Sequence, residues 1–230
     1  MKKFLVFISL SFAVAAGFAF MALGGSSFEK PSITKTEDSR GLRAGDIVFQ
    51  SSNSLQCEAV KAATGSTWSH CGILLPHNGK LMVLEAVQPV QWEDLDKWIK
   101  RDPKGIYKVK RLAADSLLTD NVVADMVKYG EKLVGKNYDI YFNWSDDEWY
   151  CSELVWKIYE ANLGTEVGIR KPLKDYNLNH PIVKEIMRKR YGTNPPLDEM
   201  MISPGAIFDC KILVDATPAN SSAKVSKKKV

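Results

Sequence analysis

Two apolar runs joined by Asn78-Gly79 constrain the fold more than any other feature of the sequence. Ser69–Leu75 and Leu81–Val87 flank the segment His77-Asn78-Gly79-Lys80. An Asn-Gly pair between two such runs is the strongest short-range signal for a β-hairpin, because both residues tolerate the positive φ that a tight hairpin turn needs. The sequence therefore predicts an antiparallel hairpin in which His77 pairs with Lys80.

Two polar residues interrupt the apolar runs, and the predicted register brings them together. The register sets Gly72 opposite Glu85, which makes Glu85 the diagonal neighbour of His70 on the same face, at roughly 7–8 Å. A buried imidazole and a buried carboxylate each need a partner. We therefore expect His70 and Glu85 to bond to each other, although a lone buried histidine is more often a satisfied core residue. Gly72 leaves space beside them that Cys151 could occupy.

The rest of the chain alternates short strands with a few helices. Hydrophobic periodicity and capping residues define the expected elements. Strands are expected at Ile47–Gln50, Ile106–Leu112 and Ala206–Val214, and helices at Leu55–Thr64, Glu93–Lys100, Thr119–Val134, Cys151–Leu163 and Pro181–Arg190. This order predicts an α+β fold with a central antiparallel β-sheet packed by helices.

Composition excludes several classes of protein. The 230 residues are 45% hydrophobic and 25% charged, which is globular, and four cysteines are too few for a disulfide scaffold. The net charge of +4 comes from six lysines at the two ends: Lys2, Lys3, Lys224, Lys227, Lys228 and Lys229. Without them, 25 basic residues face 27 acidic ones, so we expect no nucleic-acid partner.

The amino-terminal segment has the pattern of an export signal. Two lysines precede the uncharged run 4–23, which small residues follow. The expected division is a signal peptide or signal anchor at 1–25, a linker at 26–40, a domain at 41–215 and a disordered lysine-bearing tail at 216–230. The run is also just long enough to span a bilayer, so it could tether an exported chain to the membrane.

Cys151 lies in the first turn of a predicted helix, on its apolar stripe. The position suits a small core residue, but it also suits a nucleophile, because free backbone N–H groups and the helix dipole favour thiolate there. The other three cysteines, Cys57, Cys71 and Cys210, can form at most one disulfide bond if the chain is exported. The sequence does not show which two of them would pair.

A zinc site is the metal alternative. It would recruit Cys57, His70, Cys71 and His77, but their spacing matches no familiar zinc motif, and adjacent strand residues point to opposite faces. We therefore expect no metal and no cofactor.

The motifs together resemble the NlpC-type papain-like cysteine peptidases, in their circularly permuted YiiX-like branch. The relevant segments are 45–49 (GDIVF), 69–73 (SHCGI), 84–86 (LEA), 135–138 (GKNY) and 151–155 (CSELV), in that order. The nucleophile helix comes last here, whereas it precedes the strands in the unpermuted family. The resemblance covers about residues 41–163, and its specificity lies in the joint order of motifs that are individually weak.

The resemblance implies a role for each residue. Cys151 would be the nucleophile, His70 its general base, Glu85 the group that orients the imidazole, and Tyr138 an oxyanion donor together with the backbone N–H of Cys151. On the sequence alone, Tyr138 is equally well a core aromatic.

The residues around the nucleophile depart from the family pattern. Tyr150 stands where many members have an acid that helps to hold a substrate amine, and Glu153 stands where they have glycine. Tyr150 and Ser152 are therefore the expected substrate-binding residues. Asp46 is expected to be structural.

The resemblance implies hydrolysis of an amide bond through a thioester, in peptidoglycan stem peptides or related cell-wall peptides, outside the cytoplasm. Two rivals remain. One is a lipid acyl hydrolase or acyltransferase of the lecithin:retinol acyltransferase type on the same fold, and the other is a non-catalytic binding module.

Overall fold

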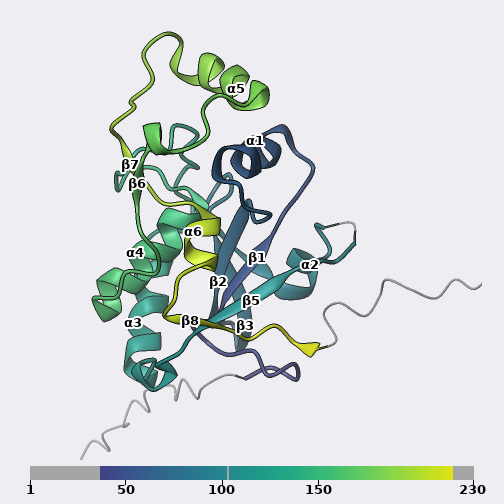
Figure 1. Cartoon of the computed structure of the whole chain (residues 1–230). Helices are drawn as coiled ribbons and strands as arrows, with labels where there is room; N and C mark the ends of the chain where they lie inside the picture. The colour runs from purple at the N-terminus through teal and green to yellow at the C-terminus, as the bar shows by residue number, and fades with distance from the viewer. Residues whose placement is uncertain (1–36, 103, 220–230) are drawn as a thin grey trace, which may run out of the picture. The chain divides into compact units, whose positions relative to one another are not determined.

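Six antiparallel strands form the central sheet of the computed structural model, which describes residues 37–102 and 104–219 (Figure 1). Their order is β4-β3-β2-β1-β5-β8, and each pairs antiparallel with its neighbour. The strands are β1 (Ile47–Gln50), β2 (His70–His77), β3 (Lys80–Glu85), β4 (Gln91–Asp94), β5 (Lys108–Leu112) and β8 (Leu213–Asp215). The predicted central antiparallel sheet is confirmed.

The β2–β3 hairpin has the predicted register. His77 pairs with Lys80, and Ile73 pairs with Leu84. Asn78 and Gly79 both have positive φ, 50° and 76°, as a two-residue type I′ turn requires. The turn therefore fixes which side chains of β2 and β3 share a face.

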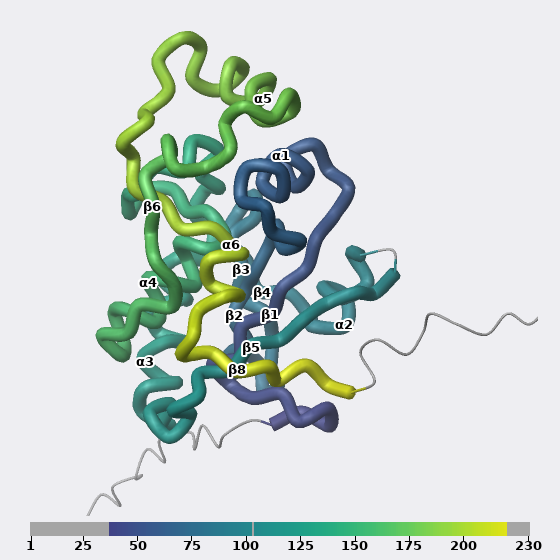
Figure 2. The backbone as a smooth tube through the Cα atoms, in the orientation of Figure 1, coloured from purple at the N-terminus to yellow at the C-terminus, as the bar shows by residue number. Residues whose placement is uncertain are grey.

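Helices cover both faces of the sheet. α4 (Cys151–Leu163) and α3 (Asp120–Glu131) pack against each other and against β2, whereas α2 (Leu95–Ile99) packs against β3 and β4. In Figures 1 and 2, α3 and α4 lie on one side of the strands and α2 on the other. α4 is buried along its first nine residues and ends at Gly164, whose φ of 59° forms a left-handed cap.

Two further helices form a layer of their own at one end of the sheet. α1 (Leu55–Thr64) begins at Ser54, whose side chain accepts a hydrogen bond from the backbone N–H of Cys57, and ends at Gly65. α5 (Pro181–Tyr191) begins with proline at its first position, where no intrahelical donor is needed. α1 and α5 pack against each other, as the upper part of Figure 1 shows.

A buried ion pair fixes the chain where it enters β1. Both carboxylate oxygens of Asp46 accept hydrogen bonds from the guanidinium of Arg111 on β5, at 2.7 Å each. The backbone N–H of Arg43 donates to the same carboxylate at 2.8 Å. Asp46 is fully buried in this pair, which agrees with its expected structural role.

The expected strand Ala206–Val214 is wrong in its first half. Residues Pro204–Phe208 form α6, because proline occupies its first turn and Ser203 caps it by accepting from the backbone N–H of Ala206. The strand begins only at Leu213.

Smaller differences concern lengths and short elements. The expected helix Glu93–Lys100 is β4 followed by α2, which Asp94 caps, and the helix Thr119–Val134 ends at Glu131. Four short elements were not predicted: the strands β6 (Lys171–Pro172) and β7 (Met200–Met201), which pair with each other, and the 3-10 turns Asp115–Leu117 and Leu173–Asp175.

The folded part extends slightly beyond the expected domain boundaries. Asp38 accepts hydrogen bonds from the backbone N–H groups of Arg40 and Leu42, within the expected linker. Ala216 and Thr217, in the expected tail, bond to Val109 on β5. The predicted export segment and residues 220–230 of the tail lie outside the described residues. Within the described ranges, no helix combines the length and apolar character that crossing a bilayer requires.

Candidate active site

Cys151 is the first residue of α4 and is 4% exposed. Two contacts of Glu153 hold the residue that precedes the helix. The backbone N–H of Tyr150 donates to the Glu153 carboxylate at 3.3 Å, and Glu153 in turn pairs with Lys157 at 2.9 Å. Burial raises the pKa of Glu153 to about 7 against the opposing effect of Lys157. These contacts fix the turn of α4 that carries Cys151.

The pKa of Cys151 lies well below its ordinary value. A hydrogen bond from Cys71 lowers it most, burial opposes this effect, and the hydrogen bond and positive charge of His70 lower it further. Burial, with the nearby Cys151 sulfur, keeps the pKa of Cys71 high, so Cys71 stays a thiol and can donate. The arrangement favours a Cys151 thiolate beside a His70 imidazolium.

His70 connects this cysteine to Glu85. Its Nε2 lies 2.6 Å from Oε2 of Glu85, which leaves Nδ1 as the ring nitrogen available to Cys151. Burial lowers the pKa of His70, but the sulfur of Cys151 and then the carboxylate of Glu85 raise it to about 10. The His70–Glu85 contact predicted from the hairpin register is therefore present.

Three groups hold the Glu85 carboxylate, which is completely buried. Besides His70, the indole Nε1 of Trp98 donates to Oε2 at 2.8 Å, and the guanidinium of Arg101 lies 2.6 Å from Oε1. Burial raises the pKa of Glu85, but the positive charges of His70 and Arg101 outweigh it and lower the pKa to about 2. Glu85 therefore stays charged across the physiological range.

The expectation that Cys151 fills the space beside Gly72 is wrong. A Cβ atom at Gly72 would meet Val83 at 2.5 Å and the Cβ atom of Glu85 at 3.3 Å. Side chains alternate along a strand, so Cys71 faces α4 while Glu85 faces Trp98 on the other side. His70 is the first residue of β2, where its ring reaches both faces at the strand end.

Tyr138 is brought close to the start of α4 by backbone pairing. It forms an isolated parallel bridge with Trp149, supported by a 2.9 Å hydrogen bond from the Trp149 N–H to the carbonyl of Asn137. Both Tyr138 and Cys151 line one pocket, and burial followed by the negative charge of Cys151 raises the pKa of Tyr138 well above its ordinary value. The hydroxyl therefore keeps its proton.

A chain of hydrogen bonds orients that hydroxyl. Arg190 donates to Oε1 of Gln56 at 2.8 Å, and Nε2 of Gln56 donates to the Tyr138 hydroxyl at 2.9 Å. Because a guanidinium can only donate, it fixes which end of the Gln56 amide faces Tyr138. The Tyr138 oxygen is then an acceptor, and its own hydrogen is free to donate into the site.

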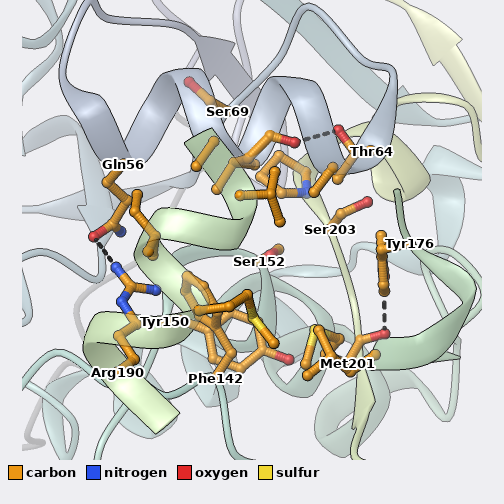
Figure 3. Close-up of a pocket in the computed structure, with 18 of the residues that line it drawn as sticks. Gln56, Thr64, Ser69, Phe142, Tyr150, Ser152, Tyr176, Arg190, Met201 and Ser203 are labelled. Atoms are coloured by element: carbon orange, nitrogen blue, oxygen red, sulfur yellow. Dashed lines mark hydrogen bonds between the residues drawn. The ribbon is translucent and has the colours of Figure 1, made fainter. Parts of the chain in front are cut away.

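Tyr150 and Ser152 border the site but are bonded to the protein backbone. The Tyr150 hydroxyl accepts from the N–H of Ile202 at 3.2 Å, and the Ser152 hydroxyl donates to the carbonyl of Ile202 at 2.9 Å. Both line the pocket shown in Figure 3. They hold the segment around Ile202 against the start of α4.

Two hollows meet at Tyr138. An apolar pocket of about 100 Å³ lies between α1 and α5, with Cys151 in its wall (Figure 3). A wider cleft of about 440 Å³ is lined by His70, Arg101 and the serines 51, 52 and 54. Gln56 and Tyr138 line both hollows.

All four cysteines are free, so no disulfide joins Cys57, Cys71 and Cys210. Cys57 lies in the first turn of α1, facing the wider cleft. Burial raises its pKa, but hydrogen bonds from serines, first that of Ser52, outweigh burial and lower it. The described residues contain no cluster of three or more His, Cys, Asp or Glu side chains that could hold a metal.

Sequence reasoning missed five residues that contact the site: Gln56, Cys71, Trp98, Arg101 and Arg190. Trp98 and Arg101 lie on and just after a short helix whose placement depends on tertiary packing. Glu85 was the signal that could have predicted them, because a fully buried carboxylate needs more than one hydrogen-bond donor.

A helix that begins with cysteine, packed on an antiparallel sheet beside a histidine, is the arrangement of papain-like cysteine hydrolases. Comparisons with known proteins agree with this class. The family described as permuted papain-like amidase enzymes (YaeF/YiiX, C92 family) matches residues 41–204. The chain therefore belongs to the permuted papain-like amidase family, as its motif order predicts.

Two relatives support the assignment. An uncharacterized protein of Escherichia coli strain K12, YiiX, is 42% identical over 167 residues, which cover 73% of this chain and 82% of that protein. A crystal structure of YiiX from Escherichia coli O157:H7, described as a metalloprotein, is 41% identical with a TM-score of 0.72. The match covers 76% of this chain and 96% of the crystallised one.

Proposed function

We propose that this amidase-family chain hydrolyses an amide bond through a thioester formed on Cys151. The observation that carries the proposal is the contact of His70 with both Cys151 and Glu85, which favours a thiolate and an imidazolium side by side. A core cysteine needs neither a lowered pKa nor a histidine held by a buried carboxylate. The non-catalytic alternative leaves these features without a purpose.

In the first half of the reaction, the Cys151 thiolate attacks the amide carbon and the carbonyl π electrons move to oxygen. When the tetrahedral intermediate collapses, the C–N bond breaks and the imidazolium of His70 gives its proton to the leaving amine. In the second half, neutral His70 removes a proton from water as the water attacks the thioester. Collapse releases the carboxylic acid and returns the thiolate with the imidazolium.

Glu85 and Tyr138 support these steps. The bond from Glu85 fixes the ring of His70 so that Nδ1 faces the sulfur, and its charge stabilises the imidazolium. The free hydroxyl hydrogen of Tyr138 and the N–H of Cys151 are the proposed donors to the oxyanion.

The family resemblance supports stem peptides of peptidoglycan or related cell-wall peptides as the substrate, with Tyr150 and Ser152 in the binding region. The apolar pocket beside Cys151 supports a second candidate, an amide whose acyl half is a hydrocarbon chain. One relative is described as a metalloprotein. Residues 37–102 and 104–219 contain no cluster of three or more His, Cys, Asp or Glu side chains that fits a metal ion. Besides water, the proposed steps use only the side chains and backbone of this chain.

The proposal is tested by incubating the protein with defined muropeptides and with simple N-acyl amides, followed by mass spectrometry of the products. Cleavage by the wild type that Cys151→Ala and His70→Ala both abolish would support it. Cleavage that survives Cys151→Ala would contradict it.

Export is a separate proposal that rests on the lysine-then-apolar start of the sequence. An alkaline phosphatase fusion after residue 40 should be active in a bacterial host. Replacing an apolar residue of the run 4–23 with arginine should abolish that activity. An inactive wild-type fusion retained in the cytosol would remove cell-wall peptides as the substrate.

A further inference from the structure

The apolar pocket lies between two helix faces that do not close on each other. α1 presents Ala59, Val60 and Ala63 to the pocket, and α5 presents Val183, Ile186 and Met187. Val183, Ile186 and Met187 follow the i, i+3, i+4 spacing of one helix face. On α1, Gln56, Ala59 and Val60 have the same spacing, and Ala63 follows at i+7. Small side chains on α1 leave a cavity where a tighter pair of helices would have packed, and that cavity has Cys151 in its wall.

The polar side chains around the cavity are already bonded to the protein. Figure 3 shows the Tyr176 hydroxyl donating to the carbonyl of Met201, and the Thr64 hydroxyl donating to its own helix. Ser152 and Tyr150 bond to the backbone of Ile202. The lining therefore offers a ligand mainly hydrocarbon contact.

One charged side chain, Arg190, occurs among the described residues that line the pocket. Its guanidinium is bonded to Gln56 and lies 5.0 Å from the centre of the Phe142 ring. Gln56 also lines the wider cleft, so Arg190 marks the junction of the two hollows. The Arg190 guanidinium orients Gln56 and, through it, Tyr138. The other described residues that line the pocket include no Lys, Arg, His, Asp or Glu.

We propose that the apolar pocket binds the acyl half of the substrate, an uncharged hydrocarbon group of about four carbons beyond the carbonyl, while the wider cleft binds the leaving amine. The inference rests on the proposed function, because the reaction determines which half of the substrate lies in which hollow. The leaving amine must lie where His70 can protonate it, and His70 lines the wider cleft. The acyl carbon stays on Cys151, which lines the apolar pocket.

The size follows from the cavity volume. An apolar cavity of roughly 150 Å³ holds one benzene molecule, so a cavity of about 100 Å³ holds about four carbons. A short fatty acyl chain and a leucine-like amino-acid side chain both meet this description.

The test is a chain-length series of N-acyl ethanolamines from acetyl to palmitoyl, with release of the amine as the readout. We expect kcat/KM to rise about fourfold per methylene up to about pentanoyl, which has four carbons beyond the carbonyl, since each buried methylene contributes about 0.8 kcal/mol, and to rise little beyond it. An N-acetyl-leucyl amide distinguishes an amino-acid source from a fatty acyl source. Equal turnover of the acetyl and hexanoyl amides would overturn the inference and leave the proposed function standing.

Two variants on one helix sharpen the assay. Ala63→Phe fills the pocket and should lower kcat/KM for the hexanoyl amide at least tenfold while sparing the acetyl amide. Ala62→Phe is the matched control, because Ala62 lines a separate hollow of about 420 Å³ with room for the ring. Equal chain-length profiles for the two variants would contradict the assignment.

Binding can be measured without turnover. In Cys151→Ala, calorimetry should show that hexanamide binds more tightly than acetamide, and that Ala63→Phe removes the difference. Such binding with no cleavage by the wild type would refute the proposed function and retain the pocket. Equal affinities for hexanamide and acetamide would refute the assignment of the apolar pocket as the acyl site.

Discussion

Replacing Glu85 by glutamine should move the alkaline limb of the pH profile to lower pH. In the wild type, His70 must be protonated to donate to the leaving amine, and its pKa is raised to about 10. We therefore expect kcat/KM to fall above about pH 10 as the imidazolium loses its proton. Glu85→Gln keeps a group that can bond to Nε2 but removes the negative charge that stabilises the imidazolium.

The size of the shift follows from the geometry. Nε2 of His70 lies 2.6 Å from the carboxylate oxygen, so the centres of charge are about 4 Å apart and interact by about 4 kcal/mol at an effective dielectric constant near 20. That is about three pKa units as an upper figure. The His70 side chain is 15% exposed and the amide still bonds to it, so we expect the limb to move down by about one to two units.

The assay is kcat/KM from pH 5 to 11 on the best amide found. Glu85→Gln should also lower kcat at neutral pH by roughly 10–10³-fold with the fold intact, against near-complete loss for His70→Ala. Glu85→Ala should be worse, because the ring is no longer oriented. Glu93→Gln is the matched control, since Glu93 binds the same Arg101 at 2.8 Å but does not contact His70.

One outcome would refute this reasoning. If Glu85→Gln and Glu93→Gln had the same alkaline limb as the wild type, the charge of Glu85 would not act on His70 during turnover. If Glu85→Ala also kept wild-type kcat, Glu85 would have no part in orienting the base.

Three further results are expected. Iodoacetamide at neutral pH should label Cys151 first and Cys57 second, because both pKa values are lowered but only Cys151 has an imidazolium partner; faster labelling of Cys57, read by peptide mapping, would count against the nucleophile. Tyr138→Phe should lower kcat about 10²-fold with little change in KM, and Gln56→Leu should lower it less, since the hydroxyl remains but is no longer oriented; equal kcat in wild type and Tyr138→Phe would remove the oxyanion role. Asp46→Asn should cost about 2–3 kcal/mol in urea unfolding by leaving its half-buried partner Arg111 uncompensated, with kcat of the folded enzyme unchanged; a selective loss of kcat would make Asp46 a catalytic candidate.

The parts of the site that were predictable from the sequence depend on local patterns, namely the hairpin turn and the apolar spacing of one helix. The turn at Asn78-Gly79 fixes the register of two strands, and that register alone places Glu85 next to His70. The apolar spacing that begins at Cys151 and the glycine at position 164 likewise predict α4. These features need no knowledge of how distant segments pack.

The missed features all depend on distant segments. Arg101 and Trp98 reach Glu85 only because α2 packs on the face of β3 that carries it. Cys71 faces away from its neighbour His70 by strand alternation, yet both contact Cys151, because the histidine lies at the strand end and the nucleophile helix crosses there. Ala206–Val214 reads as a strand by its apolar content, but the preceding Ser203-Pro204 pair starts a helix.

The central claim is that Cys151 carries the acyl group during turnover, and intact-protein mass spectrometry tests it most directly. The wild type is mixed with a hexanoyl ester or amide, quenched in acid within milliseconds to seconds, and digested to locate the adduct. The account predicts a hexanoyl thioester on the peptide that contains Cys151, absent from Cys151→Ala. Substrate cleavage at wild-type rate with no adduct at any quench time, or an adduct on Cys57 instead, would contradict the account.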